Sequence, residues 1–140
     1  MFGKILLAVD GSKNSLHAAK VAADLARAMN AKYLRIVIAF DRLPAYLGEP
    51  NLQIAIEARM KEAQNVLAKA LEAVGKVPAE IHTEFIEGPA AEAIIEVAKT
   101  RQSEVIVMGS RGLGKLSGLL LGSTSQKVVS HAACPVLIVR

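Results

Sequence analysis

The sequence of residues 104–112, Glu-Val-Ile-Val-Met-Gly-Ser-Arg-Gly, leads from an apolar segment directly into glycine, hydroxyl and basic residues. A short apolar run of this kind is typical of a strand that is covered on both faces of a parallel sheet. Glycine lets backbone N–H groups approach a ligand closely, and a helix N-terminus that follows adds partial positive charge. The stretch therefore predicts a strand that ends in an anion-binding loop, most simply for the phosphates of a nucleotide.

The charge distribution agrees with anion binding by the C-terminal part of the chain. The residues before Val105 hold thirteen basic and thirteen acidic side chains, whereas the residues from Val105 onward hold no Asp or Glu. The formal net charge of +4 therefore comes entirely from this last part, which contains Arg111, Lys115, Lys127 and Arg140.

Strand-like and helix-like segments alternate along the rest of the chain. Short apolar or alternating runs predict strands, and apolar residues spaced by three and four predict helices. Gly75 and Pro78 end one helical segment, and Gly88-Pro89 begins the next. We expect strands over 4–10, 33–40, 81–87, 104–108 and 135–139, helices over 12–29, 56–74, 89–100 and 122–131, and a loop over 41–51.

This alternation predicts a single α/β domain over residues 1–140, with an open parallel sheet, right-handed crossovers and helices on both faces. Such sheets bind ligands beyond the carboxyl ends of their strands, near the point where the strand order reverses. Asp10, Phe40 and Gly109 each end a predicted strand, so we expect them to lie along that one edge.

The composition narrows the class of protein further. A chain of 140 residues has the size of one ordinary domain. The single cysteine, Cys134, excludes an internal disulfide and fits a reducing, cytoplasmic compartment. No segment approaches the ~20 apolar residues of a membrane helix, so we expect no membrane partner. Basic residues do not interleave with aromatic ones, which argues against a nucleic-acid partner.

Two common phosphate-binding motifs fit the glycine-rich stretch poorly. Residues 109–115 match the Walker pattern G-x-x-x-x-G-K, but Leu116 stands where that motif needs a hydroxyl for Mg²⁺. Gly112, Gly114 and Gly118 loosely match a dinucleotide fingerprint. That motif also needs an acidic residue about twenty positions further on, and the chain has none after Glu104.

The spacing that remains is Gly109-x-x-Gly112, nine residues, then Gly122-Ser123. It resembles the universal stress protein family, whose nucleotide-binding members carry glycine, two residues, glycine, nine residues, glycine, and then serine or threonine. The resemblance covers essentially the full chain. It is carried also by Val9-Asp-Gly-Ser12, Glu87-Gly-Pro-Ala90, Ile106-Val-Met-Gly-Ser-Arg-Gly112 and Cys134-Pro-Val-Leu-Ile-Val139.

The resemblance implies a five-stranded sheet in the order 3-2-1-4-5 and a homodimer formed through the last strand, Pro135–Val139. It also implies binding of ATP, with AMP and ADP as alternatives, and Mg²⁺ or Mn²⁺ carried by the phosphates. Where many members have a His-Val pair near the end of the second strand, this chain has Ile38-Ala39.

The family's ligand contacts transfer to matching positions of this sequence. Asp10 would lie by the ribose, and main chain near Ala39 would meet the adenine edge. The glycines of the loop would approach the ribose and phosphates, and the hydroxyl-rich segment after Gly122 would bind the phosphates. The expected binding residues are Ala8, Val9, Asp10, Ala39, Met108, Gly109, Arg111, Gly112, Gly122, Ser123, Thr124 and Ser125.

Individual residues also have simpler interpretations. Asp10 can cap the turn at Gly11-Ser12, and residues 123–125 can act as helix N-caps, which use the same N–H groups as anion binding. Arg111 can contact phosphate or only solvent. The three histidines have no metal-site spacing.

The expected role is an ATP-binding regulatory protein of the stress response. The motif supplies donors but no general base near the γ-phosphate, so we expect no catalytic residue and at most slow hydrolysis. A low-turnover ATPase and a nucleotide-independent dimeric interaction module, using the 41–51 loop, are the alternatives.

Overall fold

A computed structural model describes residues 1–112 and 121–140. Lys115 and Leu116, which entered the comparison with the Walker motif, lie outside these ranges, as do Gly114 and Gly118.

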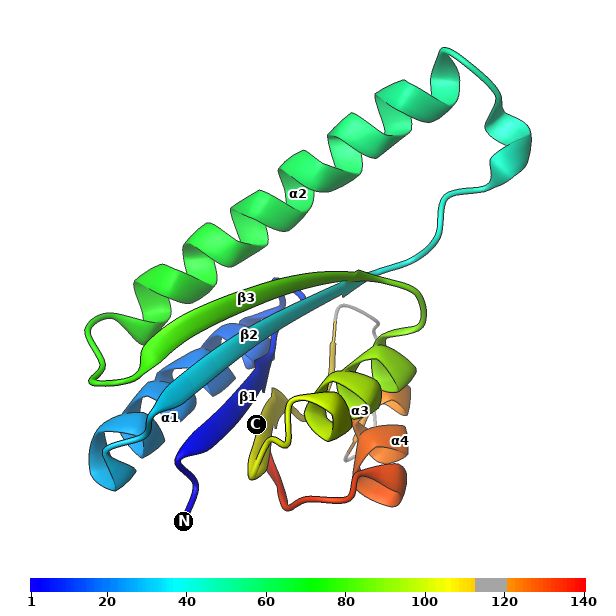
Figure 1. Cartoon of the computed structure of the whole chain (residues 1–140). Helices are drawn as coiled ribbons and strands as arrows, with labels where there is room; N and C mark the ends of the chain where they lie inside the picture. Colours follow the sequence, from blue (N-terminus) through cyan, green and yellow to red (C-terminus); the bar gives the residue numbers. More distant parts are fainter. Residues whose placement is uncertain (113–120) are drawn as a thin grey trace.

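The protein is a single-domain α/β fold around one parallel sheet with the strand order β3-β2-β1-β4-β5 (Figure 1), as predicted. The register places Ala8 opposite Val37 and Leu7 opposite Val107, so β2 and β4 both continue past the end of β1. The strands are β1 (Lys4–Ala8), β2 (Tyr33–Phe40), β3 (Glu80–Glu87), β4 (Val105–Gly109) and β5 (Val136–Val139). The helices are α1 (Lys13–Met29), α2 (Asn51–Val74), α3 (Ala90–Thr100) and α4 (Ser123–His131), with a short 3-10 helix η1 (Ala45–Leu47).

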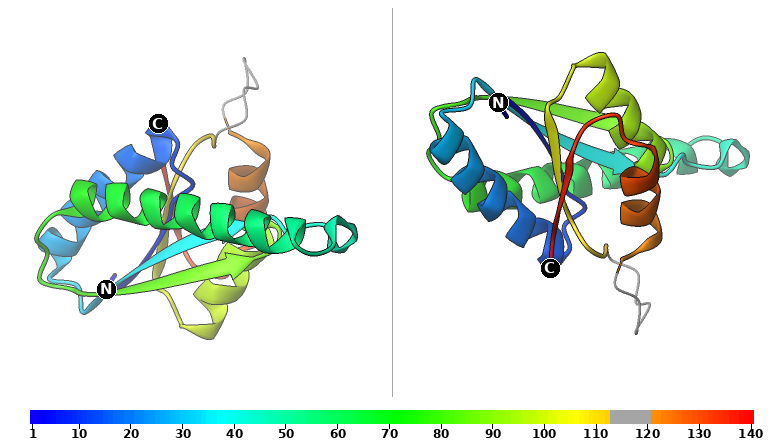
Figure 2. Two further views of the ribbon diagram at one scale, coloured as in Figure 1. Left: turned by 90° about the horizontal axis from the view of Figure 1, so that it is seen from above. Right: turned by 90° about the horizontal axis from the view of Figure 1, so that it is seen from below.

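The sheet is covered on both faces, α1 and α2 lying on one side and α3 and α4 on the other (Figure 2). Alternate residues of β1 enter the two cores: Ile5 and Leu7 pack toward α1, and Leu6 toward α3. All three are almost fully buried. This is why β1 reads as an uninterrupted apolar run rather than as an alternating one.

The segment after β2 differs in part from its prediction. The expected loop over 41–51 contains η1, and α2 begins at Asn51, five residues before the expected start at Ile56. No residue between 51 and 62 is buried, and Ile54 is 61% exposed. The first half of α2 extends past the end of the sheet (Figures 1 and 2). Its start therefore lacks the buried apolar spacing on which the prediction relied.

Within the described ranges, no helix is both long and apolar enough to span a membrane.

Candidate functional site

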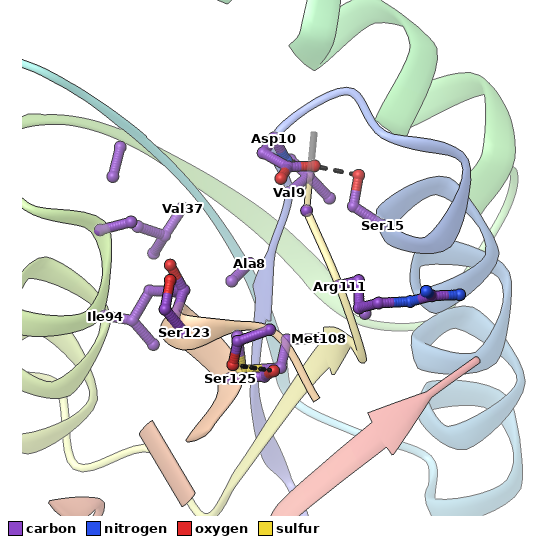
Figure 3. Close-up of a pocket in the computed structure, with 16 residues that line it drawn as sticks. Ala8, Val9, Asp10, Ser15, Val37, Ile94, Met108, Arg111, Ser123 and Ser125 are labelled. Carbon is purple, nitrogen blue, oxygen red and sulfur yellow. Dashed lines mark hydrogen bonds between the residues drawn. The ribbon is translucent and has the colours of Figure 1, made fainter. Parts of the chain in front are cut away.

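A cavity of about 210 Å³ lies at the carboxyl edge of the sheet, where β1 and β4 separate α1 from α3 and α4 (Figure 3). The sequence placed twelve candidate residues at this edge, and the structure brings all twelve to the wall of this one cavity. They share that wall with four more residues. The complete lining is Ala8, Val9, Asp10, Ser15, Val37, Ala39, Ala90, Ile94, Met108, Gly109, Arg111, Gly112, Gly122, Ser123, Thr124 and Ser125.

Ser15, Val37, Ala90 and Ile94 were missed by the sequence analysis. One of them had a usable signal. Val37 lies two residues before Ala39 and so shares its face of β2. Ile94 lies one helical turn after Ala90, which was itself not expected at the site. That α3 reaches the cavity at all depends on how the helix packs on the sheet, which local sequence does not specify.

The N-terminus of α4 faces the cavity without a side-chain cap. Gly122 is the N-cap residue, and the first hydrogen bond of the helix runs from Gln126 N to Gly122 O, at 3.0 Å. Within the described ranges, no acceptor is found for the backbone N–H groups of residues 123–125. Unpaired donors at the positive end of a helix favour the approach of an anion.

One carbonyl joins the two glycine segments of the site. Ser110 O accepts hydrogen bonds from Gly122 N and from Ser125 Oγ, both at 2.7 Å. Ser110 and Ser125 are only 3% and 2% exposed, and Asn14 Nδ2 donates to Ser110 Oγ at 3.3 Å. The Ser125 hydroxyl also lies 3.0 Å from Gly122 O. The hydroxyl proton is therefore used in a hydrogen bond within the protein. This bond holds the loop at Ser110 against the start of α4.

Close packing accounts for two of the glycines. A β-carbon on Gly109 would lie 2.9 Å from Asn14 C in α1, and one on Gly112 would fall well inside 3.0 Å of Asp10 Oδ2. By contrast, a β-carbon on Gly122 would meet nothing closer than Arg111 Cα at 3.4 Å. Gly109 and Gly112 are thus needed to assemble the site, whatever they contact in a ligand.

Asp10 is held by a small network of serines at the start of α1. Asp10 Oδ1 accepts from Ser12 N at 2.9 Å, and Ser15 Oγ accepts from Asp10 N at 3.3 Å. Ser12 caps α1 by accepting from Ser15 N at 3.2 Å. The carboxylate therefore performs the turn-capping role and still reaches the cavity wall.

Arg111 contributes less than its charge implies. Arg111 lines the cavity, but its guanidinium group points away from Ser123 and Ser125 in Figure 3. In this conformation the donors that face the cavity at the start of α4 are backbone N–H groups of that helix. A direct phosphate contact by Arg111 remains a prediction.

Helices α3 and α4, whose N-termini flank the cavity, are linked by the Glu92–Lys127 ion pair. The hydrogen bond from the Lys127 ammonium lowers the pKa of the Glu92 carboxyl group. Over residues 1–112 and 121–140, no three His, Cys, Asp or Glu side chains gather into a group that could hold a metal.

The strand order and the cavity at the switch point define a doubly wound α/β protein with a cavity at the carboxyl edge of its sheet. The chain belongs to the universal stress protein family, whose model matches residues 1–140.

Known relatives agree over the whole length. The chain is 46% identical over 140 residues to a Thermus aquaticus protein named "Universal stress protein in QAH/OAS sulfhydrylase 3'region", with each chain covered in full. It superposes on universal stress protein UspA from Lactobacillus plantarum with a TM-score of 0.86 at 26% identity, covering 99% and 98% of the two chains. A universal stress protein solved in complex with cAMP matches at 31% identity and a TM-score of 0.65, covering 97% and 94%.

Proposed function

We propose that this protein binds ATP at the carboxyl edge of its sheet and acts as a regulatory protein of the stress response in the cytoplasm. The observation that carries the proposal is the uncapped N-terminus of α4, which presents backbone donors to a glycine-walled cavity. The cAMP complex of a similar protein supports an adenine nucleotide as ligand class. AMP and ADP are the alternative ligands.

The lining residues fit a nucleotide lying along the edge. The N–H groups of Ser123 and Thr124 would bind phosphate oxygens, and Gly109 and Gly112 would lie beneath the ribose and phosphates. Asp10 suits the ribose hydroxyls, because a carboxylate accepts hydrogen bonds from hydroxyl groups and repels phosphate. Main chain at Ala39 would meet the base, against the apolar side chains of Val37, Ile94 and Met108.

The same residues give little support for hydrolysis. Asp10 is the one carboxylate among the described lining residues, and the proposal places it at the ribose. In-line attack needs a positioned water and stabilisation of the developing charge. We therefore expect ATP to be held rather than rapidly cleaved. Mg²⁺ or Mn²⁺ would be carried by the phosphates, with at most a hydroxyl of Ser123 or Thr124 as a protein ligand.

The last strand is the proposed dimer contact. In the described part of the chain β5 pairs only with β4, so one edge is open. Leu137 of β5 and Val129 of α4 are 39% and 47% exposed. An open strand edge with exposed apolar neighbours favours pairing with a second copy.

Two variants of one residue test the nucleotide proposal. Gly122 has φ −75° and ψ 170°, a conformation favoured before proline, and proline is well tolerated at the first helical position. Ser123→Pro therefore removes one N–H from the site and keeps the helix, while the control Ser123→Ala removes only the hydroxyl. By titration calorimetry we expect about a tenfold loss of ATP affinity in Ser123→Pro and a smaller loss in Ser123→Ala.

The wild-type titration decides between the proposal and its alternatives. Failure of the intact protein to bind ATP, ADP or AMP would contradict the proposal and favour a nucleotide-independent interaction module. Phosphate release with multiple turnovers, abolished in Ser123→Pro, would instead favour a genuine ATPase.

A further inference from the structure

A second chamber of about 620 Å³ adjoins the cavity at the carboxyl edge of the sheet. The two spaces share Asp10, Ala39, Ala90 and Thr124 as lining residues, so they form one continuous site. The second chamber alone has a volume typical of small-molecule sites, roughly 300–1,000 Å³. It is therefore large enough for a chemical group beyond the ligand of the first cavity.

The far wall of this chamber is built by the middle of α2, where the helix begins to extend past the sheet. Arg59, Glu62 and Val66 line it from that helix, opposite the β3–α3 turn at Gly88-Pro89. Arg59 Nη1 donates to Asp41 O at 3.1 Å, which ties the helix to the exit of β2. A β-carbon on Gly88 would meet nothing within 4 Å, as expected beside an open space.

The chamber carries excess negative charge. Its charged side chains are three carboxylates, Asp10, Asp41 and Glu62, and one guanidinium, Arg59. None of them forms an ion pair with another side chain in residues 1–112 or 121–140. Charges of one sign that line a hollow add their fields and select ligands by charge. The chamber should therefore repel phosphate and accept neutral or cationic groups.

The ribose is the part of the nucleotide from which a group would enter. Val37, Ile94 and Met108 line only the first cavity, whereas Asp10, Ala39, Ala90 and Thr124 line both spaces, and Asp10 is the one charged residue among these four. With the base against the apolar residues and the ribose at Asp10, as proposed above, we expect the ribose hydroxyls to face the opening.

We propose that the second chamber receives a neutral or positively charged group attached to a ribose hydroxyl of the bound adenine nucleotide, and that it excludes a phosphate at that position. This inference rests on the nucleotide-binding function proposed above. It extends that function by naming which modified nucleotides the site accepts.

A series of ATP derivatives that differ in the charge of one substituent tests the proposal. The probes are ATP, its 2′/3′-O-(2-aminoethylcarbamoyl) derivative, which is cationic, its neutral 2′/3′-O-ethylcarbamoyl analogue, and ATP carrying a 3′-phosphate. By calorimetry we expect the cationic derivative to bind at least as tightly as ATP and the neutral one within about threefold of it. The 3′-phosphate derivative should bind at least about tenfold more weakly, because it adds negative charge beside three carboxylates.

A charge variant in the chamber wall provides the second arm. Glu62→Gln should narrow the difference in affinity between the cationic and 3′-phosphate derivatives by about threefold. The matched control, Glu72→Gln, lies on the same helix outside the chamber and should not change this difference. Added salt should also reduce the difference in affinity between the cationic and 3′-phosphate derivatives.

The outcomes separate this inference from the proposed function. Absence of ATP binding would overturn both. Normal ATP binding together with equal or tighter binding of the 3′-phosphate derivative would overturn the inference alone. So would loss of both carbamoyl derivatives while N6-(6-aminohexyl)-ATP still binds, because that result would assign the chamber to the base.

Discussion

Replacing Gly112 by alanine tests how the site is assembled. The glycine has no left-handed φ, so an alanine backbone is accommodated, but its β-carbon would fall well inside 3.0 Å of Asp10 Oδ2. The carboxylate has to turn away, and doing so breaks its 2.9 Å hydrogen bond from Ser12 N. A hydrogen bond to a charged group contributes about 1.5–3 kcal/mol, and Asp10 is partly exposed, so we expect Gly112→Ala to lower the free energy of unfolding by about 1–2 kcal/mol.

The same change should weaken ATP binding by about tenfold or more, because Asp10 leaves the position proposed for the ribose contact. The clash is specific to the Asp10 side chain, so it can be isolated by a double-mutant cycle. In an Asp10→Ala background the added methyl group meets no oxygen, and Gly112→Ala should cost less than about 0.5 kcal/mol. In an Asp10→Asn background the side chain keeps its size, and the full cost should return.

Urea unfolding followed by circular dichroism supplies the four free energies of each cycle, provided that the m-values agree. Equal costs of Gly112→Ala in the wild-type and Asp10→Ala backgrounds would refute the packing argument. An unchanged free energy of unfolding on Gly112→Ala in the wild-type background would refute the packing argument as well.

Three further predictions concern the surroundings of the site. Gly109→Ala should lower the free energy of unfolding by about 2–3 kcal/mol in urea titrations, because its β-carbon meets α1 backbone that cannot shift cheaply; a loss below about 0.5 kcal/mol would contradict this packing. Ser125→Ala should weaken ATP binding about fivefold and leave adenosine binding unchanged, since its hydroxyl braces only the phosphate end; equal losses for both ligands would show general destabilisation. The pKa of Glu92 is lowered by Lys127 in the folded protein, so the stability that the pair contributes is present above the unfolded-state pKa and lost as pH falls through the folded one. Acid titration should show a smaller stability loss in Glu92→Gln than in the wild type, and identical profiles would contradict the link.

Much of the fold could be predicted because its strands carry their own signal. The β1 run, buried on both faces, and the Gly88-Pro89 helix start leave little ambiguity in the pattern. The start of α2 at Asn51 could not be found in this way, because an exposed helix has no buried face to impose spacing. In the structure the helix begins at Asn51 and its first half runs past the end of the sheet.

The candidate site could likewise be predicted only in part. Strand ends predicted that Asp10, Phe40 and Gly109 share one edge, since the parallel topology fixes where those ends meet. The set of twelve binding residues came from the resemblance to the universal stress protein family. The sequence alone could not show why position 109 has to be glycine. The reason is the close approach of the α1 backbone, which lies ninety-odd residues earlier in the chain. The buried role of Ser125 likewise depends on a carbonyl fifteen residues away, although the hydroxyl itself was expected at the site.

Substitutions in different walls of this pocket are expected to affect the fold differently, and the half of α2 that extends past the sheet accounts for the difference. The phosphate end is made of buried serines and crowded glycines, where substitution disturbs packing. The wall formed by Arg59 and Glu62 stands on a helical segment with no buried residue, so substitutions there cost the fold little. We therefore expect substitutions in this wall to change the proposed ligand preference at little cost to the stability of the fold.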